Sequence, residues 1–308
     1  MSESVIIGVD HGYAAMKTAH FSFHTGLVAH EHEPYTLNNV LEYGGKYYVV
    51  GSGRQPLQKD KTQTEDYYLL TLAAIAKELK YRNAGTVADV HLAAGLPLTS
   101  FGRDKKAFRD YLCRDGKPVS FRFEGQDYAI TISKVSLYPQ GYAAVLTQSG
   151  LLNEPSVIVA DIGGWTVDLM RLDNRIPNAA TCRSLELGMI RCLDEISEQI
   201  RRSLDLSMTA AQIESVLRSD TSHVNEDAKK IIHLEAERYT KRLLSAIAES
   251  GLDVRAMPAV FLGGGAALLK RHVSAADGLC RPVILDDISL NAKGYEWLTE
   301  RLEQKHEQ

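Results

Sequence analysis

Two aspartates in this sequence each stand just before a glycine turn, a pattern that can bind a phosphorylated ligand together with a metal ion. Backbone amides in a glycine turn can converge on phosphate oxygens. An aspartate at the end of a strand can hold hydrated magnesium, which usually takes only one or two carboxylates. Most Asp-x-Gly sequences mark ordinary turns, but a matched pair predicts two loops that clamp a polyphosphate. The residues of this pattern are Asp10, Gly12 and Lys17 in the first loop and Asp161, Gly163, Gly164 and Thr166 in the second.

A third glycine-rich motif lies near the end of the chain, where VFLGGGAALLK contains Gly263, Gly264 and Gly265. Glycine lets the backbone approach a ligand closely, and the start of a helix favours anions. Together with the two aspartate loops, this predicts that the triplet faces the ribose and α-phosphate of a nucleotide. The alternative is a tight turn that binds nothing. The sequence contains no G-x-x-x-x-G-K-[ST], so a P-loop NTPase is set aside.

Each of the three motifs follows an apolar run that predicts a buried strand, at Ser4–Val9, Ser156–Ile162 and Ala259–Leu262. We expect Met16–Phe23 and Leu27–His32 to pair as a hairpin. A helix should begin at Pro139, which suits the first helical turn, and run to about residue 152. Further helices are predicted at Tyr67–Tyr81, Asp104–Cys113, Met189–Leu204, Ala210–Leu217, Asp227–Glu249, Ala266–His272 and Ala292–Leu302. Strands that alternate with helices indicate an α/β architecture.

The two aspartate loops also suggest an ancient duplication. Asp161 stands 151 positions after Asp10 in a chain of 308 residues. Each ends an apolar strand, precedes a glycine turn and opens into a second strand. The length suits two domains of ordinary size.

Composition limits the classes of protein that the chain can belong to. Hydrophobic residues make up 44% and charged residues 24%, which is typical of a soluble globular protein. The net charge of -4 argues against a protein that grips nucleic acid through a basic surface, so any link to DNA should run through a partner. No signal peptide, membrane span or CxxC pair is found, which predicts a cytoplasmic protein without membrane contact.

The ordered motifs DHGYAAMK, YPQGYAA, DIGGWTVD and LGGGAALL resemble the phosphate, connecting and adenosine motifs of the superfamily of actin, sugar kinases and 70-kDa heat-shock proteins. The length and the ending NAKGYEWLTERL are most similar to bacterial plasmid-segregation actins of the ParM/StbA type. The resemblance implies an actin-like fold of two duplicated α/β domains around a nucleotide cleft. It also implies ATP or GTP with Mg²⁺ as cofactors.

The resemblance assigns a role to each motif residue. Asp10 and Asp161 would flank magnesium, Lys17 would reach the β-phosphate, and Gln140 would orient the attacking water. The nucleoside would face the triplet Gly263, Gly264 and Gly265. The phosphates would be cradled by Gly12, Tyr13, Ala14 and Ala15 in the first loop, and by Gly163, Gly164, Trp165 and Thr166 in the second.

Two positions depart from the pattern of the relatives. Tyr13 stands where a small or hydroxyl residue is usual, and Trp165 where Gly or Thr is common. Backbone donors survive both changes, so phosphate binding is still expected. Arg191, Glu195 and Glu198 fall in the region that contacts ribose and adenine in relatives, although solvated helix charges explain them equally well.

The expected domains are residues 1–150, with an outer subdomain at about 33–85, and residues 151–290, with an outer subdomain at about 188–255. The final helix, 291–308, should pack back on the first domain. The resemblance implies ATP-dependent filaments that segregate plasmid DNA through an adaptor protein bound at a centromere-like site. One alternative is a small-molecule kinase on the same fold, which would need a carboxylate base where Gln140 stands. The other is a chromosomal bacterial cytoskeletal actin.

Overall fold

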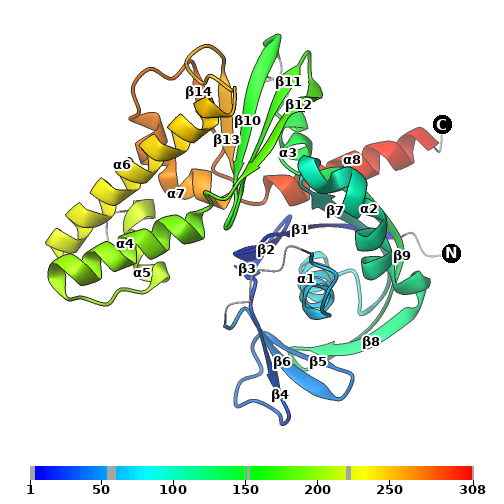
Figure 1. Ribbon diagram of the computed structural model, residues 1–308. Helices are drawn as coiled ribbons and strands as arrows, with labels where there is room; N and C mark the ends of the chain where they lie inside the picture. The colour runs from blue at the N-terminus through cyan, green and yellow to red at the C-terminus, as the bar shows by residue number, and fades with distance from the viewer. Residues whose placement is uncertain (1–3, 54–59, 149, 151–152, 220–222, 307–308) are drawn as a thin grey trace. The chain divides into compact units, whose positions relative to one another are not determined.

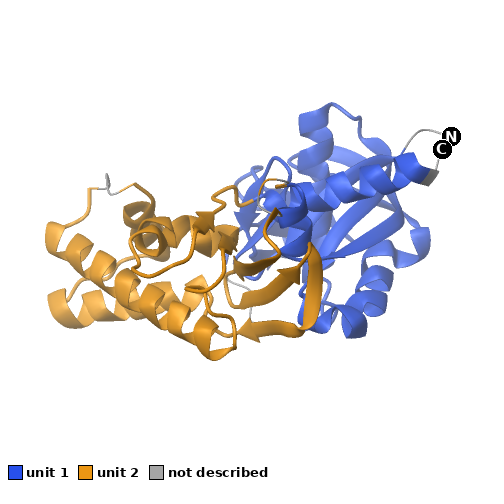
Figure 2. Ribbon diagram, turned by 90° about the horizontal axis from the view of Figure 1, so that it is seen from above, with its two compact units in different colours: residues 1–147, 289–308 blue, residues 148–288 orange. Residues whose placement is uncertain are grey.

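The computed structural model describes residues 4–53, 60–148, 150, 153–219 and 223–306. The chain divides into two compact units (Figure 2): unit 1 comprises residues 1–147 and 289–308, and unit 2 comprises residues 148–288. The C-terminal segment of the chain therefore belongs to the same unit as the N-terminal segment.

The described residues of unit 1 form a nine-stranded sheet with the strand order β3-β2-β1-β7-β9-β8-β5-β6-β4. Strands β1, β7 and β9 are parallel at its centre, and the other pairs are antiparallel. The strands are β1 Val5–His11, β2 Ala15–Thr18, β3 Ser22–His24, β4 Leu27–His30, β5 Val40–Tyr43, β6 Lys46–Val50, β7 Val87–Leu96, β8 Pro118–Phe123 and β9 Gln126–Pro139.

The helices of unit 1 cover both faces of this sheet. They are α1 Asp66–Arg82, α2 Leu98–Cys113, η1 Arg114–Gly116, α3 Tyr142–Leu146 and α8 Leu290–His306. Figure 1 shows α1 within the curve of the sheet, where 12 of its 17 residues are buried. Alternate residues of β7 lie on opposite faces of the sheet. Leu92 packs in the core around α1, whereas Ala93 packs against Tyr295 of α8.

Unit 2 has a five-stranded sheet with the order β12-β11-β10-β13-β14. Its strands are β10 Ser156–Ile162, β11 Val167–Asp173, β12 Ile176–Leu185, β13 Ala259–Leu262 and β14 Pro282–Ile284. Its helices are α4 Met189–Leu204, α5 Ala210–Ser219, α6 Glu226–Glu249 and α7 Gly263–Ser274. The apolar stripes of these helices form one core with the side chains of Ile158, Ala160 and Ile162.

The two units share a local pattern of strand pairing around the aspartate loops. Strand β1 is antiparallel to β2 and parallel to β7, and β10 is antiparallel to β11 and parallel to β13. This repeated pattern agrees with the duplication that the two loops suggested.

Three expectations about secondary structure were wrong. Strand β4 pairs with β6 and not with β2, and β2 instead pairs with the short strand β3. The segment from Pro139 is not a helix start, because β9 continues through Pro139 and α3 begins only at Tyr142 after Gly141 with φ +72°. The glycine triplet does not form a turn before a helix but is itself the first turn of α7.

Candidate nucleotide-binding site

Loop 1, defined as residues 10–17, joins β1 to β2 and brings three of the expected site residues together. Asp10 is only 4% exposed at the end of β1. Lys17 Nζ lies 3.0 Å from Asp10 Oδ2, and Gln140 Nε2 donates to Asp10 Oδ1 at 3.1 Å. Burial alone would raise the pKa of Asp10, but the charge and hydrogen bond of Lys17 outweigh it and hold the pKa below its usual value. Asp10 is therefore a carboxylate at neutral pH.

The backbone of loop 1 is held by neighbouring side-chain and main-chain donors. Gly12 is required, because a Cβ there would lie 2.4 Å from the carbonyl oxygen of Ala15. The hydroxyl of Thr25 donates to the Gly12 carbonyl at 2.7 Å, and the Thr25 amide donates to the Ala14 carbonyl at 3.0 Å. Carbonyls of the loop are thus turned toward Thr25. Among the described residues, the amide of Ala14 has no acceptor, as a phosphate-binding loop requires.

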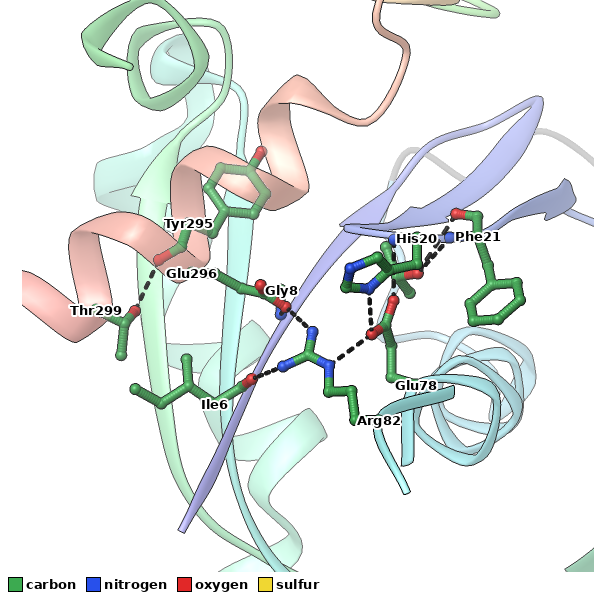
Figure 3. A network of polar contacts seen from close by, with 10 residues as sticks. Ile6, Gly8, His20, Phe21, Glu78, Arg82, Tyr295, Glu296 and Thr299 are labelled. Atoms are coloured by element: carbon green, nitrogen blue, oxygen red, sulfur yellow. Dashed lines mark hydrogen bonds and ion pairs between the residues drawn. The ribbon is translucent and has the colours of Figure 1, made fainter. Parts of the chain in front are cut away.

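Behind loop 1, a network of charged groups anchors strand β1 (Figure 3). Arg82 of α1 donates from Nε to Glu78 at 2.7 Å and from a second nitrogen to the Ile6 carbonyl at 2.7 Å, and it also pairs with Glu296 of α8. Glu296 accepts the amide of Gly8 at 2.8 Å. The network therefore ties α1, β1 and α8 together two residues before Asp10.

The pKa values of the two carboxyls in this network move in opposite directions. Burial would raise the pKa of Glu78, but hydrogen bonds from Thr18, His20 and Arg82 lower it below its usual value. Burial raises the pKa of Glu296, in spite of its pairing with Arg82. Arg82 therefore neutralises two acidic groups that are both largely shielded from water.

Loop 2, defined as residues 161–166, joins β10 to β11 and is shaped mainly by backbone contacts. The amide of Gly163 donates to the Thr166 carbonyl at 2.9 Å and closes the turn. Three successive carbonyls then accept hydrogen bonds from the start of α4. These bonds are Met189 to Gly163 at 3.0 Å, Ile190 to Gly164 at 2.8 Å and Gly188 to Trp165 at 2.9 Å.

The carbonyls of loop 2 are thus occupied, whereas the amides of Gly164 and Trp165 donate to no acceptor among the described residues. This arrangement suits an anion, because the backbone amides can donate to a ligand while the backbone carbonyls already accept hydrogen bonds within the protein. Asp168 accepts a hydrogen bond from the hydroxyl of Thr166 at 3.2 Å, so it braces its own loop.

Unit 2 also places the glycine triplet against Asp161. Strands β10 and β13 pair in parallel with Asp161 opposite Leu262, so Gly263 follows directly beside the aspartate. Gly263 has φ +88°, and a Cβ there would lie 2.4 Å from Asp161 Oδ1. Gly264 instead has nothing within 4 Å of the Cβ position, so this face of the helix start is open.

A cavity of about 710 Å³ in unit 2 extends from loop 2 along helix α4. Trp165 lines it together with Arg191, Glu195 and Glu198, the charged residues of the region that the sequence assigned to ribose and adenine. Arg191 donates to Glu195 at 3.1 Å, and both side chains are partly exposed at the cavity wall. Trp165, a departure from the pattern of relatives, therefore lies at the wall of a cavity whose other lining residues are charged or polar.

Three residues near the loops carried no signal in the sequence analysis. Thr25 and Lys61 contact carbonyls of loop 1 from positions 13 and 50 residues after their partners Gly12 and His11. Gly188 approaches loop 2 so closely that a Cβ would lie 2.3 Å from the carbonyl carbon of Trp165. A glycine directly before a strong helical pattern could have marked Gly188, but no local pattern marks the other two.

Comparisons with known proteins agree with this geometry. Residues 8–142 match the family model "Actin like proteins N terminal domain", and residues 159–275 match "Archaeal actin homologue MreB-like, C-terminal". The curated archaeal actin homologue of Thermoplasma acidophilum is 24% identical, with 83% of this chain and 82% of the relative covered.

Solved structures show the same fold at low sequence identity. An archaeal actin homologue in complex with ADP superposes with a TM-score of 0.76 at 21% identity, covering 96% of this chain and 99% of that chain. A chain of a 15-stranded ParM filament from Clostridium botulinum gives a TM-score of 0.75 at 19% identity, covering 97% of this chain and 99% of that chain. The apo pSK41 ParM protein gives 0.71 at 17% identity and full coverage of both chains. In the part of the chain that the structure describes, no helix is long and apolar enough to cross a membrane.

Proposed function

We propose that this chain, which belongs to the actin-like superfamily, is a magnesium-dependent ATPase that assembles into nucleotide-dependent filaments. The observation that carries the proposal is the repeated loop: in each unit an almost fully buried aspartate lies at the end of a strand and precedes a glycine turn. In these turns the amides of Ala14, Gly164 and Trp165 donate to no acceptor among the described residues. Two such loops in one chain suit a polyphosphate ligand better than two ordinary turns do.

The residues of unit 1 would act on the phosphates. The amide of Ala14 would bind phosphate oxygens together with neighbouring groups of loop 1, and Lys17 would supply a positive charge toward the β-phosphate. Gln140 would orient the attacking water, because positioning and electrostatics dominate phosphoryl transfer. Its amide already donates to Asp10, so aspartate and glutamine would act as one positioned pair.

The residues of unit 2 would hold the metal and the nucleoside. A magnesium ion held here would supply positive charge to offset the charge of the phosphates during hydrolysis. Asp161 suits it, since the carboxylate is a hard oxygen ligand at a buried strand end. Asp10 accepts two hydrogen bonds and would hold the ion through water molecules, which magnesium retains readily. Gly264 offers an open backbone surface to the nucleoside, and the cavity beside Trp165 has room for ribose and base, of ATP or GTP.

For the cellular role, we propose that the filaments segregate plasmid DNA. The support is the whole-chain likeness to ParM structures, one of which is described as a filament. A net charge of -4 suits a protein that reaches DNA through an adaptor, so the isolated chain should bind duplex DNA negligibly at physiological salt. Tight binding of DNA by the isolated chain would contradict the adaptor.

Light scattering and pelleting test the proposal directly. Wild-type protein above micromolar concentration should assemble with Mg-ATP or Mg-GTP, and EDTA should prevent this. Asp161→Ala should lose nucleotide binding and hydrolysis together, whereas Asp253→Ala, which removes an exposed carboxylate of unit 2, should behave as wild type. A wild-type protein that stays monomeric with either nucleotide and phosphorylates a small molecule would identify a kinase instead.

A further inference from the structure

A second lysine reaches loop 1 from a distant part of the sequence. Lys61 stands five residues before helix α1 and is only 8% exposed. Its ammonium donates to the carbonyl of His11, the residue that directly follows Asp10. A buried ammonium is costly unless it is paired or hydrogen-bonded, so its place beside this loop has a physical reason.

Two aromatic rings lie close to the same ammonium. Lys61 Nζ lies 5.0 Å from the ring centroid of Tyr13 and 5.5 Å from that of Tyr67. Both distances are within the range of a cation–π interaction. Tyr13 belongs to loop 1 and is one of the two positions where the loop departs from its relatives. In this chain its ring is therefore used to position Lys61.

The balance of charge in loop 1 shows why a second lysine matters. The carboxylate of Asp10 and the ammonium of Lys17 pair at 3.0 Å and offset each other. Lys61 brings a second ammonium to the same loop, where it donates to the carbonyl of His11. Loop 1 is therefore contacted by two lysine ammonium groups, and only that of Lys17 is paired with Asp10 in the contacts given above.

We propose that Lys61 is a positioning residue for the nucleotide phosphates, a second cation of loop 1 that Tyr13 holds in place. It keeps the His11 carbonyl turned away from the ligand and adds the positive charge that draws the phosphate chain into the loop. The inference rests on the proposed nucleotide site and deepens it, because it names a residue that sets phosphate affinity.

The test compares two lysines that are held in the same way. Lys77 also lies near two rings, those of Phe123 at 5.2 Å and Phe23 at 5.9 Å, and it donates to Asn39 at 2.8 Å. It is largely buried on α1 and contacts no residue of loop 1 in these interactions. Lys77→Met loses ring contacts and a hydrogen bond as Lys61→Met does, and in addition an ion pair with Glu124 at 3.8 Å, so it controls for a general loss of packing.

Calorimetric titration with Mg-ADP should show affinity reduced about 10-fold or more in Lys61→Met and unchanged in Lys77→Met. Because a charge is removed, the dependence of affinity on salt concentration should also weaken in Lys61→Met. Lys61→Arg should restore both the affinity and the salt dependence in part. Tyr13→Leu leaves the charge of the chain unchanged and should weaken Mg-ADP binding about 3-fold by releasing the ammonium; it also serves as the test if Lys61→Met does not fold.

The outcomes separate this inference from the proposed function. If wild-type protein binds no nucleotide, the nucleotide site itself is wrong, and the role of Lys61 is wrong with it. If wild-type protein binds and Lys61→Met binds equally well, or with the same salt dependence, only the role of Lys61 is contradicted. Equal losses of Mg-ADP affinity in Lys61→Met and Lys77→Met would mean that Lys61 contributes only to packing, which would also contradict its proposed role.

Discussion

Loops 1 and 2 have the same plan, but they are stabilised by different kinds of contact. Loop 1 is stabilised mainly by side chains. Lys17 and Gln140 contact Asp10, and Thr25 and Lys61 donate to backbone carbonyls of the loop. In loop 2, the main chain at the start of α4 binds three carbonyls in succession. The backbone of Gly263 packs against the aspartate where loop 1 has a lysine.

This difference shows how a duplicated loop can diverge while its backbone geometry persists. Loop 1 depends on charge and on hydrogen-bonding side chains, so it should be sensitive to substitutions that change a charge or remove a polar group. Loop 2 depends on close backbone approach, so it should be sensitive to added bulk. The predictions below test this contrast, starting with the largest expected effect.

Replacing Arg82 should be the most damaging change to unit 1. Arg82→Met leaves Glu78, whose side chain is fully buried, and Glu296 without their shared cation, which should cost about 3 to 5 kcal/mol of unfolding free energy. Arg103→Met, which breaks an exposed ion pair in the same unit, should leave this free energy almost unchanged. Each unit carries one of the two tryptophans, so Trp297 fluorescence in a Trp165→Phe background follows urea unfolding of unit 1 alone.

The effect of Arg82→Met should also depend on pH. In wild type the pKa of Glu78 is lowered, so the stability it contributes is present above about pH 4.5 and is lost as the pH falls through its folded pKa. Without Arg82 both buried carboxyls should bind protons more readily in the folded state, which raises stability as the pH falls. The difference between wild type and variant should therefore narrow from pH 7 to pH 5. A constant difference would mean that Arg82 acts through packing and not through charge.

Gln140→Ala tests the side-chain chemistry of loop 1. Loss of a water-positioning group should slow phosphate release about 10- to 1,000-fold, or about 1.4 to 4 kcal/mol of barrier. Nucleotide binding and assembly should remain largely intact, so filaments of the variant should persist after those of wild type have disassembled. Phosphate release and scattering decay are measured on the same samples. Hydrolysis at the wild-type rate would mean that Gln140 only supports Asp10.

Gly263→Ala tests the backbone chemistry of loop 2. The new Cβ would lie 2.4 Å from Asp161 Oδ1 at φ +88°, so we expect about 2 to 3 kcal/mol of destabilisation and a marked loss of Mg-ADP affinity. Gly264→Ala is the matched control, because its Cβ meets nothing within 4 Å. It should be neutral or stabilise the first turn of α7 by up to about 1 kcal/mol. Equal effects of the two changes would contradict close approach at Gly263.

Sequence predicted the elements of unit 2 well because their patterns are local. The apolar face of α4 and the buried runs of β10 and β13 are each complete within a short window, and their bounds agree with the structure. Strand β12 was not predicted, since this half-exposed edge strand contains Pro177 and does not alternate regularly. The prediction of a helix start at Pro139 was wrong because its strand partner, Leu96 in β7, lies 43 positions earlier in the chain and is not visible in the local pattern.

The same distinction explains what could be predicted of the candidate site. Asp10, Lys17 and Asp161 stand in motifs that can be read along the chain. In the structure Lys17 pairs with Asp10 and Gly263 lies beside Asp161, and the roles of these residues toward a nucleotide stay predictions. Lys61 could not be predicted, because its partners His11 and Tyr13 lie about 50 positions away in a different segment. A motif shows which backbone can bind a phosphate, whereas only the tertiary structure shows which distant side chains support it.

The smallest predicted effect concerns a single hydroxyl group. Thr25 is 3% exposed and donates to the Gly12 carbonyl at 2.7 Å. Thr25→Val keeps the shape of the side chain but leaves this carbonyl without its side-chain donor, which should cost about 1 to 2 kcal/mol. Because that carbonyl is then less firmly held, the affinity of loop 1 for Mg-ADP should fall about 3- to 10-fold.

Thr240 of unit 2 provides the control for that measurement. Its buried hydroxyl donates to the Ala236 carbonyl at 2.8 Å within helix α6, where the carbonyl also belongs to the helical ladder. Thr240→Val should therefore leave Mg-ADP affinity unchanged. Among the residues that the structure describes, loop 2 has no counterpart of Thr25, since main-chain amides bind its carbonyls and side-chain substitution cannot remove those donors. If Thr25→Val and Thr240→Val bind Mg-ADP equally well in parallel titrations, side chains do not control the geometry of loop 1, and the contrast between the two loops fails.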